Sequence, residues 1–246
     1  MASAPYIHYV LVTGANQGIG FETAKKLATE YDDYHVIMTG RRKDAIEDAV
    51  AKLNALGLKN VEAVVMDVLS DESIHAAIKQ IDQAHGRLDV LINNAGISRT
   101  SGPVNRQTWL DIYNTNVAAV EIITDACIPL LKKSQVTKRI VNVTTNLASL
   151  KRKLDPTTFQ HKVEYPPYST SKTALNMLTA HYVVRYEDDP TWKINLTCPG
   201  FCATNLNGFA GFDDPASGAV NSVRLATLGP DGPTGTFTDK DGVVEW

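Results

Sequence analysis

The stretch Thr13-Gly14-Ala15-Asn16-Gln17-Gly18-Ile19-Gly20 joins an apolar run at 7–12 to a predicted helix at 19–31. A tight turn from strand to helix needs residues that accept a positive φ, which glycine does without steric cost. Glycines also let backbone N–H groups approach a pyrophosphate at the positive end of the helix dipole. The spacing is G-x3-G-x-G rather than G-x-G-x-x-G, and glycines that merely shape the turn are the alternative. Because the turn directly follows a buried strand, we expect it to bind a dinucleotide.

Short β-rich runs alternate with longer helical segments along the chain. Runs of Val, Ile and Leu without polar alternation are typical of parallel strands covered on both faces. The expected strands lie at 7–12, 35–39, 61–66, 88–93, 139–144, 193–198 and 234–238. The expected helices lie at 19–31, 43–57, 71–85, 106–132, 168–186 and 215–228. The pattern predicts an α/β fold, with a mostly parallel seven-stranded sheet and helices on both faces.

The length of 246 residues suits a single doubly wound, Rossmann-type domain that spans 1–246. We expect residues 1–100 to form mainly the dinucleotide-binding half, and residues 101–246 to supply the catalytic and substrate-binding half. Hydrophobic residues make up 43% of the chain, which is enough for a sizeable core and excludes global disorder.

The charge and the apolar pattern exclude several classes of partner. The net charge of −3 offers no basic excess for a phosphate backbone, so we expect no nucleic-acid partner. No apolar run approaches the roughly 20 residues that span a bilayer, and the N-terminus lacks a secretory pattern, so a cytoplasmic protein without membrane contact is expected. Cys127, Cys198 and Cys202 make no disulfide framework and have no second Cys/His pair nearby, so no metal site is expected.

Two arginines, Arg41 and Arg42, follow the second predicted strand about 20 residues after the glycine turn. A site that prefers NAD would place Asp or Glu there, to accept hydrogen bonds from the ribose hydroxyls. Asp32 and Asp33 precede the strand and therefore belong to the wrong edge of the sheet. Guanidinium groups form strong charge-assisted bonds to a 2′-phosphate, so we expect NADP(H) as the cofactor. A solvated basic turn is the alternative.

Tyr168 and Lys172 stand four residues apart and so share one face of a predicted helix. A free phenol has a pKa of about 10 and is a poor acid–base catalyst at neutral pH. A nearby ammonium, together with the charge of an oxidised nicotinamide, is expected to stabilise the phenolate and to lower the pKa of Tyr168. Such a tyrosine donates a proton to the alkoxide that forms when hydride reaches a carbonyl carbon. The Y-x3-K spacing alone occurs by chance on many helices.

Six motifs in order resemble those of the short-chain dehydrogenase/reductase family, and the resemblance covers essentially the whole chain. The motifs are Thr13-Gly14…Gly18…Gly20, Asp67-Val68, Asn93-Asn94-Ala95-Gly96, Asn116, Tyr168-x3-Lys172 and Pro199-Gly200…Thr204. The C-terminal GPDGPTGTFTDKDGVVEW also resembles the tail of carbonyl reductases in this family. The resemblance implies reduction of a ketone, aldehyde or quinone carbonyl to an alcohol, with NADPH as hydride donor and Tyr168 as general acid.

The resemblance also assigns roles to single residues. Lys172 is implied to hold the nicotinamide ribose, Asp67 and Val68 to contact the adenine, and the Cys202 backbone and the Thr204 hydroxyl to meet the carboxamide. The full set expected to bind the cofactor is Gly14, Asn16, Gln17, Gly18, Ile19, Gly20, Arg41, Arg42, Asp67, Val68, Asn94, Ala95, Gly96, Tyr168, Lys172, Pro199, Gly200, Cys202 and Thr204. The expected catalytic set is Asn116, Thr145, Tyr168 and Lys172.

Thr145 stands where the family usually has a serine that polarises the substrate oxygen. Threonine keeps the hydroxyl but adds a methyl group and stiffens χ1. Ser149, four residues later, is the alternative donor. The resemblance implies that Asn116 kinks the long helix and binds a water linked to the lysine, whereas Asn114 is expected to be an ordinary surface residue.

An insert at 151–167 separates the Thr145 region from Tyr168 and must border the site, because both its ends do. In the carbonyl reductases that this chain resembles, a similar insert obstructs the pairing of tetrameric relatives, so a monomer or homodimer is expected. Phe201, Phe209 and Phe212 could make the expected substrate wall at 205–215 apolar, and aromatic residues that form the core of the loop are the alternative. Two further functions stay open: oxidation of a secondary alcohol in a biosynthetic pathway, and a non-catalytic NADP(H)-binding regulator.

Overall fold

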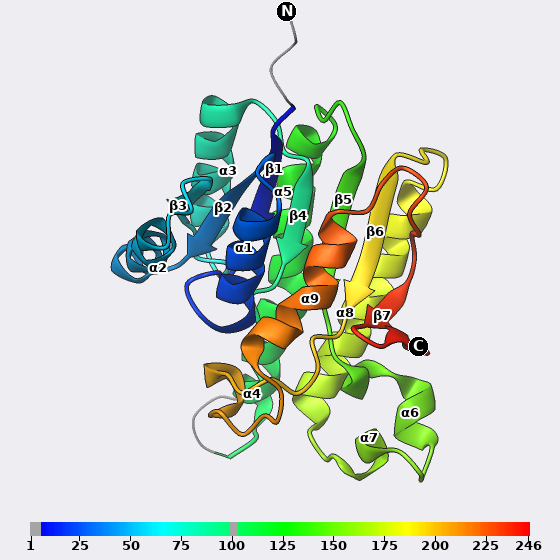
Figure 1. Ribbon diagram of the computed structural model, residues 1–246. Coiled ribbons are helices and arrows are strands. Elements are labelled where there is room, and N and C mark those ends of the chain that lie inside the picture. Colours follow the sequence, from blue (N-terminus) through cyan, green and yellow to red (C-terminus); the bar gives the residue numbers. More distant parts are fainter. Residues whose placement is uncertain (1–5, 99–102) are drawn as a thin grey trace, which may run out of the picture.

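The computed structural model describes residues 6–98 and 103–246, and its sheet follows the order β3-β2-β1-β4-β5-β6-β7-β8 (Figure 1). The strands are β1 (His8–Val12), β2 (Tyr34–Gly40), β3 (Val61–Val65), β4 (Val90–Asn93), β5 (Lys138–Val143), β6 (Trp192–Thr197), β7 (Phe237–Asp239) and β8 (Gly242–Val243). All neighbouring strands pair in parallel except β7 and β8. The doubly wound α/β prediction is confirmed, but the expected number of seven strands was wrong by one short antiparallel strand.

Helices cover both faces of the sheet. They are α1 (Gly18–Glu30), α2 (Lys43–Ala55), α3 (Asp71–His85), α4 (Arg106–Tyr113), α5 (Ala119–Leu131), α6 (Leu150–Leu154), α7 (Phe159–Lys162), α8 (Pro166–Arg185) and α9 (Pro215–Ala226). Apolar side chains of α1, α2 and α9 pack on one face, and those of α3, α5 and α8 pack on the other. In Figure 1, α1 and α9 lie in front of the sheet. No helix within the described ranges combines the length and apolarity that a membrane span needs.

The strand order reverses between β1 and β4, because β1 has β2 on one side and β4 on the other. In doubly wound sheets, ligands bind beyond the carboxyl ends of the strands at such a reversal. The loops that follow β1, β4, β5 and β6 all emerge at this edge, where α4, α6 and α7 also lie (Figure 1). The topology therefore gathers four loops at one place.

The helix expected at 106–132 is interrupted. A π-helical turn, Asn114–Ala118, separates α4 from α5. The Thr115 hydroxyl donates to the Asp111 carbonyl oxygen (2.9 Å), and the side chain of Asn116 is engaged by the loop after β4. A π-turn inserts an extra residue into the helical ladder and redirects the side chains near it. The sequence predicted the kink through the resemblance, but not its form.

A chain of buried hydrogen bonds docks α8 onto the sheet. Asn93 Nδ2 donates to Asn142 Oδ1 (2.8 Å), and Asn142 Nδ2 donates to Thr179 Oγ1 on α8 (2.8 Å). Directly after the end of β5, Thr144 Oγ1 donates to Asn176 Oδ1 (2.7 Å). Polar groups inside a core must be paired, so these bonds select one position of α8 along the sheet.

We expect Asn142→Ala to lower the free energy of unfolding by about 1–3 kcal/mol, because it leaves Asn93 Nδ2 and the Thr179 hydroxyl short of a buried partner. Urea denaturation measures the change. Asn54→Ala on α2 is the matched control, because the Asn54 side chain has no hydrogen-bond partner among the described residues. An equal loss in both variants would contradict a docking role for Asn142.

Candidate functional site

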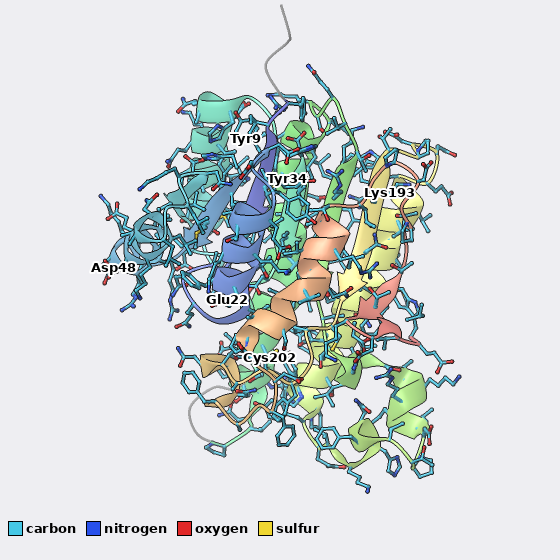
Figure 2. All side chains as sticks on the ribbon, viewed as in Figure 1. Tyr9, Glu22, Tyr34, Asp48, Lys193 and Cys202 are labelled. Carbon is cyan, nitrogen blue, oxygen red and sulfur yellow. The ribbon has the colours of Figure 1, made fainter. Side chains whose placement is uncertain are left out.

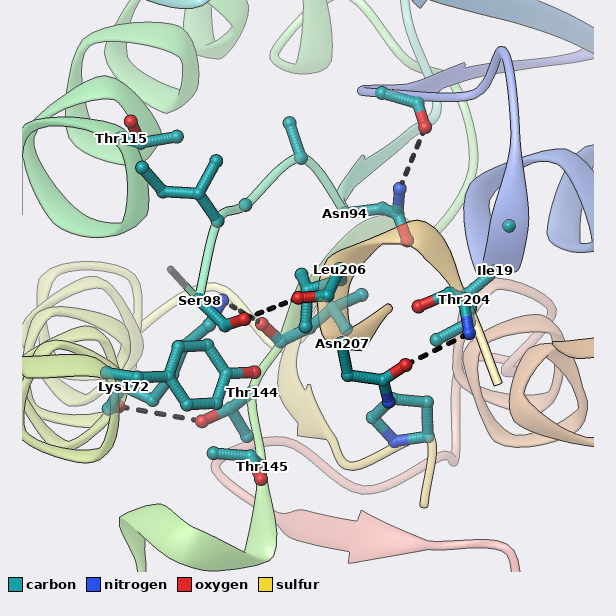
Figure 3. A pocket seen from close by; sticks show the side chains of 18 of the residues that line it. Ile19, Asn94, Ser98, Thr115, Thr144, Thr145, Lys172, Thr204, Leu206 and Asn207 are labelled. Carbon is teal, nitrogen blue, oxygen red and sulfur yellow. Dashed lines mark hydrogen bonds between the residues drawn. The ribbon is translucent and has the colours of Figure 1, made fainter. Parts of the chain in front are cut away.

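A cleft of about 800 Å³ opens at the carboxyl edge of the sheet. Eighteen of the residues singled out from the sequence line it: Gly14, Asn16, Gln17, Gly18, Ile19, Arg41, Asp67, Val68, Asn94, Ala95, Gly96, Thr145, Tyr168, Lys172, Pro199, Gly200, Cys202 and Thr204. Gly20, Arg42 and Asn116 lie outside the lining. In Figure 3, Lys172, Thr144 and Thr145 lie on one side of the pocket, and Ile19 and Thr204 lie on the other.

The glycine turn needs its glycines for two different reasons. Gly14 and Gly18 have φ values of +63° and +58°, which side chains disfavour. Gly20 has an ordinary backbone, but a Cβ there would collide with the Asn94 side chain and come within 2.6 Å of the Gly14 carbonyl oxygen. Backbone conformation therefore favours glycine at positions 14 and 18, and lack of space requires it at position 20.

Helix α1 begins at this turn without a side-chain cap. Its N-cap residue, Gln17, makes no capping hydrogen bond, so the first N–H groups of the helix have no side-chain acceptor there. These groups and the helix dipole favour an anion at the mouth of the cleft. The cradle and the uncapped helix together fit the pyrophosphate of a dinucleotide.

Thr13 and Asn94 hold the turn against the loop after β4. Thr13 Oγ1 accepts hydrogen bonds from the backbone N–H groups of Asn94 (3.0 Å) and Ala95 (2.9 Å). In return, Asn94 Nδ2 donates to the carbonyl oxygens of Thr13 (2.9 Å) and Gly14 (3.2 Å). Asn94 thus has a structural task in the protein itself, besides lining the cleft.

The two arginines after β2 differ in position. Arg41 is exposed and lines the cleft, whereas Arg42 is the N-cap residue of α2 and lies outside the lining. Neither guanidinium forms an ion pair with a carboxylate in the part of the chain that the structure describes. Arg41 is therefore the one placed to meet a phosphate in the cleft.

Tyr168 and Lys172 lie one turn apart on α8, and both line the cleft. Lys172 is 3% exposed, and its Nζ donates to the Val143 carbonyl oxygen (2.8 Å). Burial lowers the pKa of Lys172 to about 8 and raises the pKa of Tyr168 above that of a free phenol. The expected lowering of the Tyr168 pKa is therefore wrong for the protein alone, because desolvation of the phenolate outweighs any attraction to the ammonium.

Asn116 lies behind the cleft wall, fully buried. Its Oδ1 accepts from the Ile97 N–H (2.9 Å), and its Nδ2 donates to the Ile97 carbonyl oxygen (2.8 Å) and to Ser171 Oγ (3.0 Å). A Cβ on Gly96 would lie 3.1 Å from Asn116 Oδ1 and 3.5 Å from Lys172 Nζ. Asn116 therefore ties the loop after β4 to α8 beside the lysine.

The two candidate hydroxyl donors have different environments. Thr145 lines the cleft, and its Oγ1 accepts only a long hydrogen bond from the Leu147 N–H (3.3 Å). Ser149 is fully buried outside the lining, and its Oγ accepts from the Arg152 N–H (3.1 Å) as the N-cap of α6. The geometry favours Thr145 over Ser149 as the group that a ligand in the cleft would meet.

The substrate wall is only partly the one expected. Of the three phenylalanines, Phe201 lines the cleft, whereas Phe209 and Phe212 do not. Phe212 is 86% exposed and packs edge-on against Phe201, with ring centroids 5.4 Å apart. Pro199 is followed by a glycine with φ of +87°, so a true turn carries the chain past the cleft.

Sequence reasoning missed several lining residues. They include Ile97, Ser98, Thr115 and Leu147, and Asn114, expected to be an ordinary surface residue, lines the cleft as well. The wall expected around 205–215 supplies Leu206 and Ala210. The insert at 151–167 supplies Phe159, Val163 and Tyr165, as its position predicted. The Ser98 hydroxyl donates to the Leu206 carbonyl oxygen (2.6 Å) and joins two loops across the cleft, a contact with no signal in the sequence (Figure 3).

Comparisons with known proteins agree with this geometry. A family profile described as short chain dehydrogenase matches residues 8–211. The short-chain dehydrogenase anuI of Penicillium roqueforti is 40% identical over 225 residues, which cover 89% of this chain and 88% of that protein. The (+)-neomenthol dehydrogenase of Capsicum annuum is 28% identical over 303 residues, which cover 93% of this chain and 94% of that protein.

Two solved structures share the fold at 25% identity. Salutaridine reductase from Papaver somniferum superposes with a TM-score of 0.81 and covers 94% of this chain and 99% of its own. NADPH-bound carbonyl reductase from chicken fatty liver superposes with a TM-score of 0.83, and the match covers 98% of this chain and 100% of that one.

We expect Gly20→Ala to weaken binding of NADPH, because the new methyl group forces the turn and Asn94 apart. The same overpacking lowers the free energy of unfolding by about 1–3 kcal/mol. Isothermal titration and urea denaturation measure the two effects. Gly229→Ala is the control, since nothing lies within 4 Å of a Cβ there. Unchanged affinity in Gly20→Ala would contradict the proposed cradle.

Proposed function

The chain belongs to the short-chain dehydrogenase/reductase family, whose members are oxidoreductases that use nicotinamide cofactors on small molecules, and we propose that it reduces a ketone, aldehyde or quinone carbonyl with NADPH. The observation that carries the proposal is the placement of Tyr168 and Lys172 on the wall of a cleft that also contains the glycine turn. Residues 1–100 mainly hold the dinucleotide, and residues 101–246 supply the catalytic side chains and the substrate wall.

The nicotinamide ring, when bound, supplies the hydride. The Tyr168 hydroxyl donates its proton to the substrate oxygen as negative charge develops there. Burial raises the pKa of this phenol, so it is protonated at neutral pH, which is the form that a general acid needs. Lys172, with a pKa of about 8, is still largely charged at neutral pH and stabilises the phenolate that remains.

Two further side chains complete this mechanism. The Thr145 hydroxyl, which stands at the family's serine position, donates a hydrogen bond to the substrate oxygen. Asn116 is a positioning residue, because it fixes the loop at Ile97 relative to α8 and so keeps Lys172 beside the cleft. Both roles require a rigid scaffold, which the buried bonds between β5 and α8 provide.

The residues of the nucleotide end support NADP(H). Arg41 lines the cleft without a carboxylate partner among the described residues, which suits a 2′-phosphate. Backbone N–H groups of the glycine turn suit the pyrophosphate, Asp67 and Val68 the adenine, and Cys202 and Thr204 the carboxamide. The similar carbonyl reductase from chicken fatty liver is an NADPH-bound structure.

A mostly apolar substrate is proposed from the lining of the catalytic end. Phe159, Val163, Tyr165, Phe201 and Leu206 contribute side chains there. Similar proteins are named salutaridine reductase and (+)-neomenthol dehydrogenase, which supports a small organic carbonyl or alcohol compound as the substrate class. Oxidation of a secondary alcohol uses the same residues in reverse, and the relative named as a neomenthol dehydrogenase keeps that direction open.

We expect Tyr168→Phe to lower turnover about 10²- to 10⁴-fold while NADPH binding is kept, because only the proton donor is lost. The test follows NADPH absorbance with a panel of ketones, aldehydes and quinones. Tyr165→Phe is the control, because it removes a second phenol of the cleft whose ring lies 6.2 Å from that of Tyr168. If the wild-type protein binds NADPH but turns over no carbonyl, and Tyr168→Phe behaves identically, the chain is a non-catalytic regulator.

We expect Arg41→Ala to raise the Kd for NADPH by roughly 10- to 100-fold, since it removes a charge-assisted bond of about 1.5–3 kcal/mol. The Kd for NADH changes little. Arg42→Ala, with an equal loss of charge outside the lining, is the control and has the smaller effect. Titration of both cofactors against both variants checks this, and a wild-type preference for NADH would contradict it.

We expect Thr145→Val to lower kcat about 10²- to 10³-fold, because it removes a donor to the developing oxyanion with little change of shape. Thr145→Ser keeps the hydroxyl and retains turnover. Ser149→Ala costs about 1 kcal/mol of stability through the lost cap of α6, but leaves kcat nearly unchanged. Steady-state kinetics decides between them, and the reverse pattern would assign the role to Ser149.

A further inference from the structure

Three side chains that are far apart in the sequence meet at the amino-terminal ends of the strands, on the side of the sheet opposite the cleft. His35 is the second residue of β2, Glu62 is the second residue of β3, and His85 is the last residue of α3. We call them the His–Glu–His cluster. In Figure 2, the label Tyr9 marks this end of the sheet, because Tyr9 pairs with His35, and the label Cys202 marks the end with the cleft.

The register of the sheet brings the cluster together. Ile37 of β2 pairs with Glu62 of β3, so His35, two residues before Ile37, lies diagonally beside Glu62 on the same face. Helix α3 covers this face and runs back toward the amino edge, where it ends at His85. The cluster is therefore built on regular elements rather than on a loop.

The ligating atoms of the cluster converge. One nitrogen of each histidine and one oxygen of Glu62 all lie within 4.8 Å of one another, which is the one such grouping of His, Cys, Asp and Glu among the described residues. Glu62 Oε1 lies 2.5 Å from His85 Nε2 and 3.4 Å from His35 Nε2. His35 Nε2 is buried and has no hydrogen-bond partner.

We propose that the His–Glu–His cluster binds a divalent transition metal ion of the zinc type. Two imidazoles and a carboxylate are a known three-ligand set for zinc, with a fourth position left for water. Bonds of about 2.0–2.1 Å in a tetrahedron place neighbouring ligand atoms about 3.3 Å apart, close to the His35–Glu62 separation. Binding requires His85 and Glu62 to separate by less than about 1 Å, and it requires the two histidine nitrogens, which lie within 4.8 Å of each other, to reach a similar spacing of about 3.3 Å.

The surroundings favour a cation. His85 lies in the last turn of α3, where the helix dipole presents its negative end. Burial opposes ionisation of Glu62, but its close contacts with His35 and His85 outweigh this effect and lower the pKa of the carboxyl. Tyr9 stacks on His85 at 4.3 Å between ring centroids and lies edge-on to His35 at 5.9 Å, so both imidazoles are held in place.

The ion joins β2, β3 and α3, and it lies away from the cleft. Its effect is therefore on stability rather than on hydride transfer. A ligand that binds only the folded state at 100 times its Kd shifts the unfolding equilibrium by about 100-fold. No metal site was expected from the sequence, because the three cysteines have no Cys/His pair nearby and the spacing from His35 to Glu62 to His85 fits no local metal motif.

The test titrates tag-free, metal-stripped protein with ZnCl₂ and, separately, with MgCl₂. We expect one equivalent of zinc to bind with a raised Tm, and magnesium, which prefers oxygen ligands, to leave the Tm unchanged. Loss of a residue that only hydrogen-bonds to a metal ligand weakens metal binding roughly 10- to 100-fold. Loss of a ligand costs more, so we expect a larger decrease in zinc affinity for each of His35→Gln, Glu62→Gln and His85→Gln. His75→Gln, on the exposed side of α3, is the control and binds as the wild type does.

Cobalt(II) in the wild-type protein gives an answer that does not depend on how the variants fold. Nitrogen and oxygen ligands give visible d–d bands of four- or five-coordinate cobalt without an intense thiolate charge-transfer band. Such a thiolate band would assign the metal to Cys127, Cys198 or Cys202 and overturn the proposal. Zinc binding that survives both His85→Gln and His35→Gln would also overturn the proposal. So would the absence of saturable zinc binding, which would leave only the hydrogen bond between His85 and Glu62.

Discussion

The reciprocal hydrogen bonds between Thr13 and Asn94 join the loops after β1 and β4, and the shape of the cleft depends on them. They draw the two loops so close that a Cβ on Gly20 has no space. The start of α1 is thereby fixed at the point where the strand order reverses, with its free N–H groups toward the cleft. A site for an anion follows from backbone geometry alone, before any charged side chain is considered.

The catalytic end depends on a different constraint, which is burial. α8 is held on β5 by paired amides and hydroxyls, so Lys172 is presented to the cleft with almost no exposure. The same desolvation lowers the pKa of Lys172 to about 8 and raises that of Tyr168, which keeps the phenol protonated, as the proposed role of general acid requires. The opposite edge of the sheet carries the His–Glu–His cluster, so the catalytic chemistry and the proposed metal ion are separated by the length of the strands.

Sequence periodicity predicted the parallel sheet because buried strands are mostly apolar runs, as at 7–12 and 35–39. β8 was missed because a strand of two exposed residues shows no pattern of hydrophobicity. The π-turn was missed because helix propensity does not distinguish an α-helix, with about 3.6 residues per turn, from a wider π-helical turn. Local motifs point to the cleft, as in the glycine turn, where Gly14, Gly18 and Ile19 line it and Gly20 does not. Contacts between distant segments, such as Ser98 with Leu206, leave no local pattern and became visible only in the fold.

The central claim is that this cleft delivers hydride to a carbonyl carbon. The most direct measurement uses NADPH that carries deuterium at one of the two C4 positions of the nicotinamide, with any carbonyl compound that the protein consumes, and mass spectrometry of the alcohol. We predict that the label from one C4 position, and not from the other, appears on the carbinol carbon. If the alcohol carries no deuterium from either position, the proposed direct hydride transfer is contradicted.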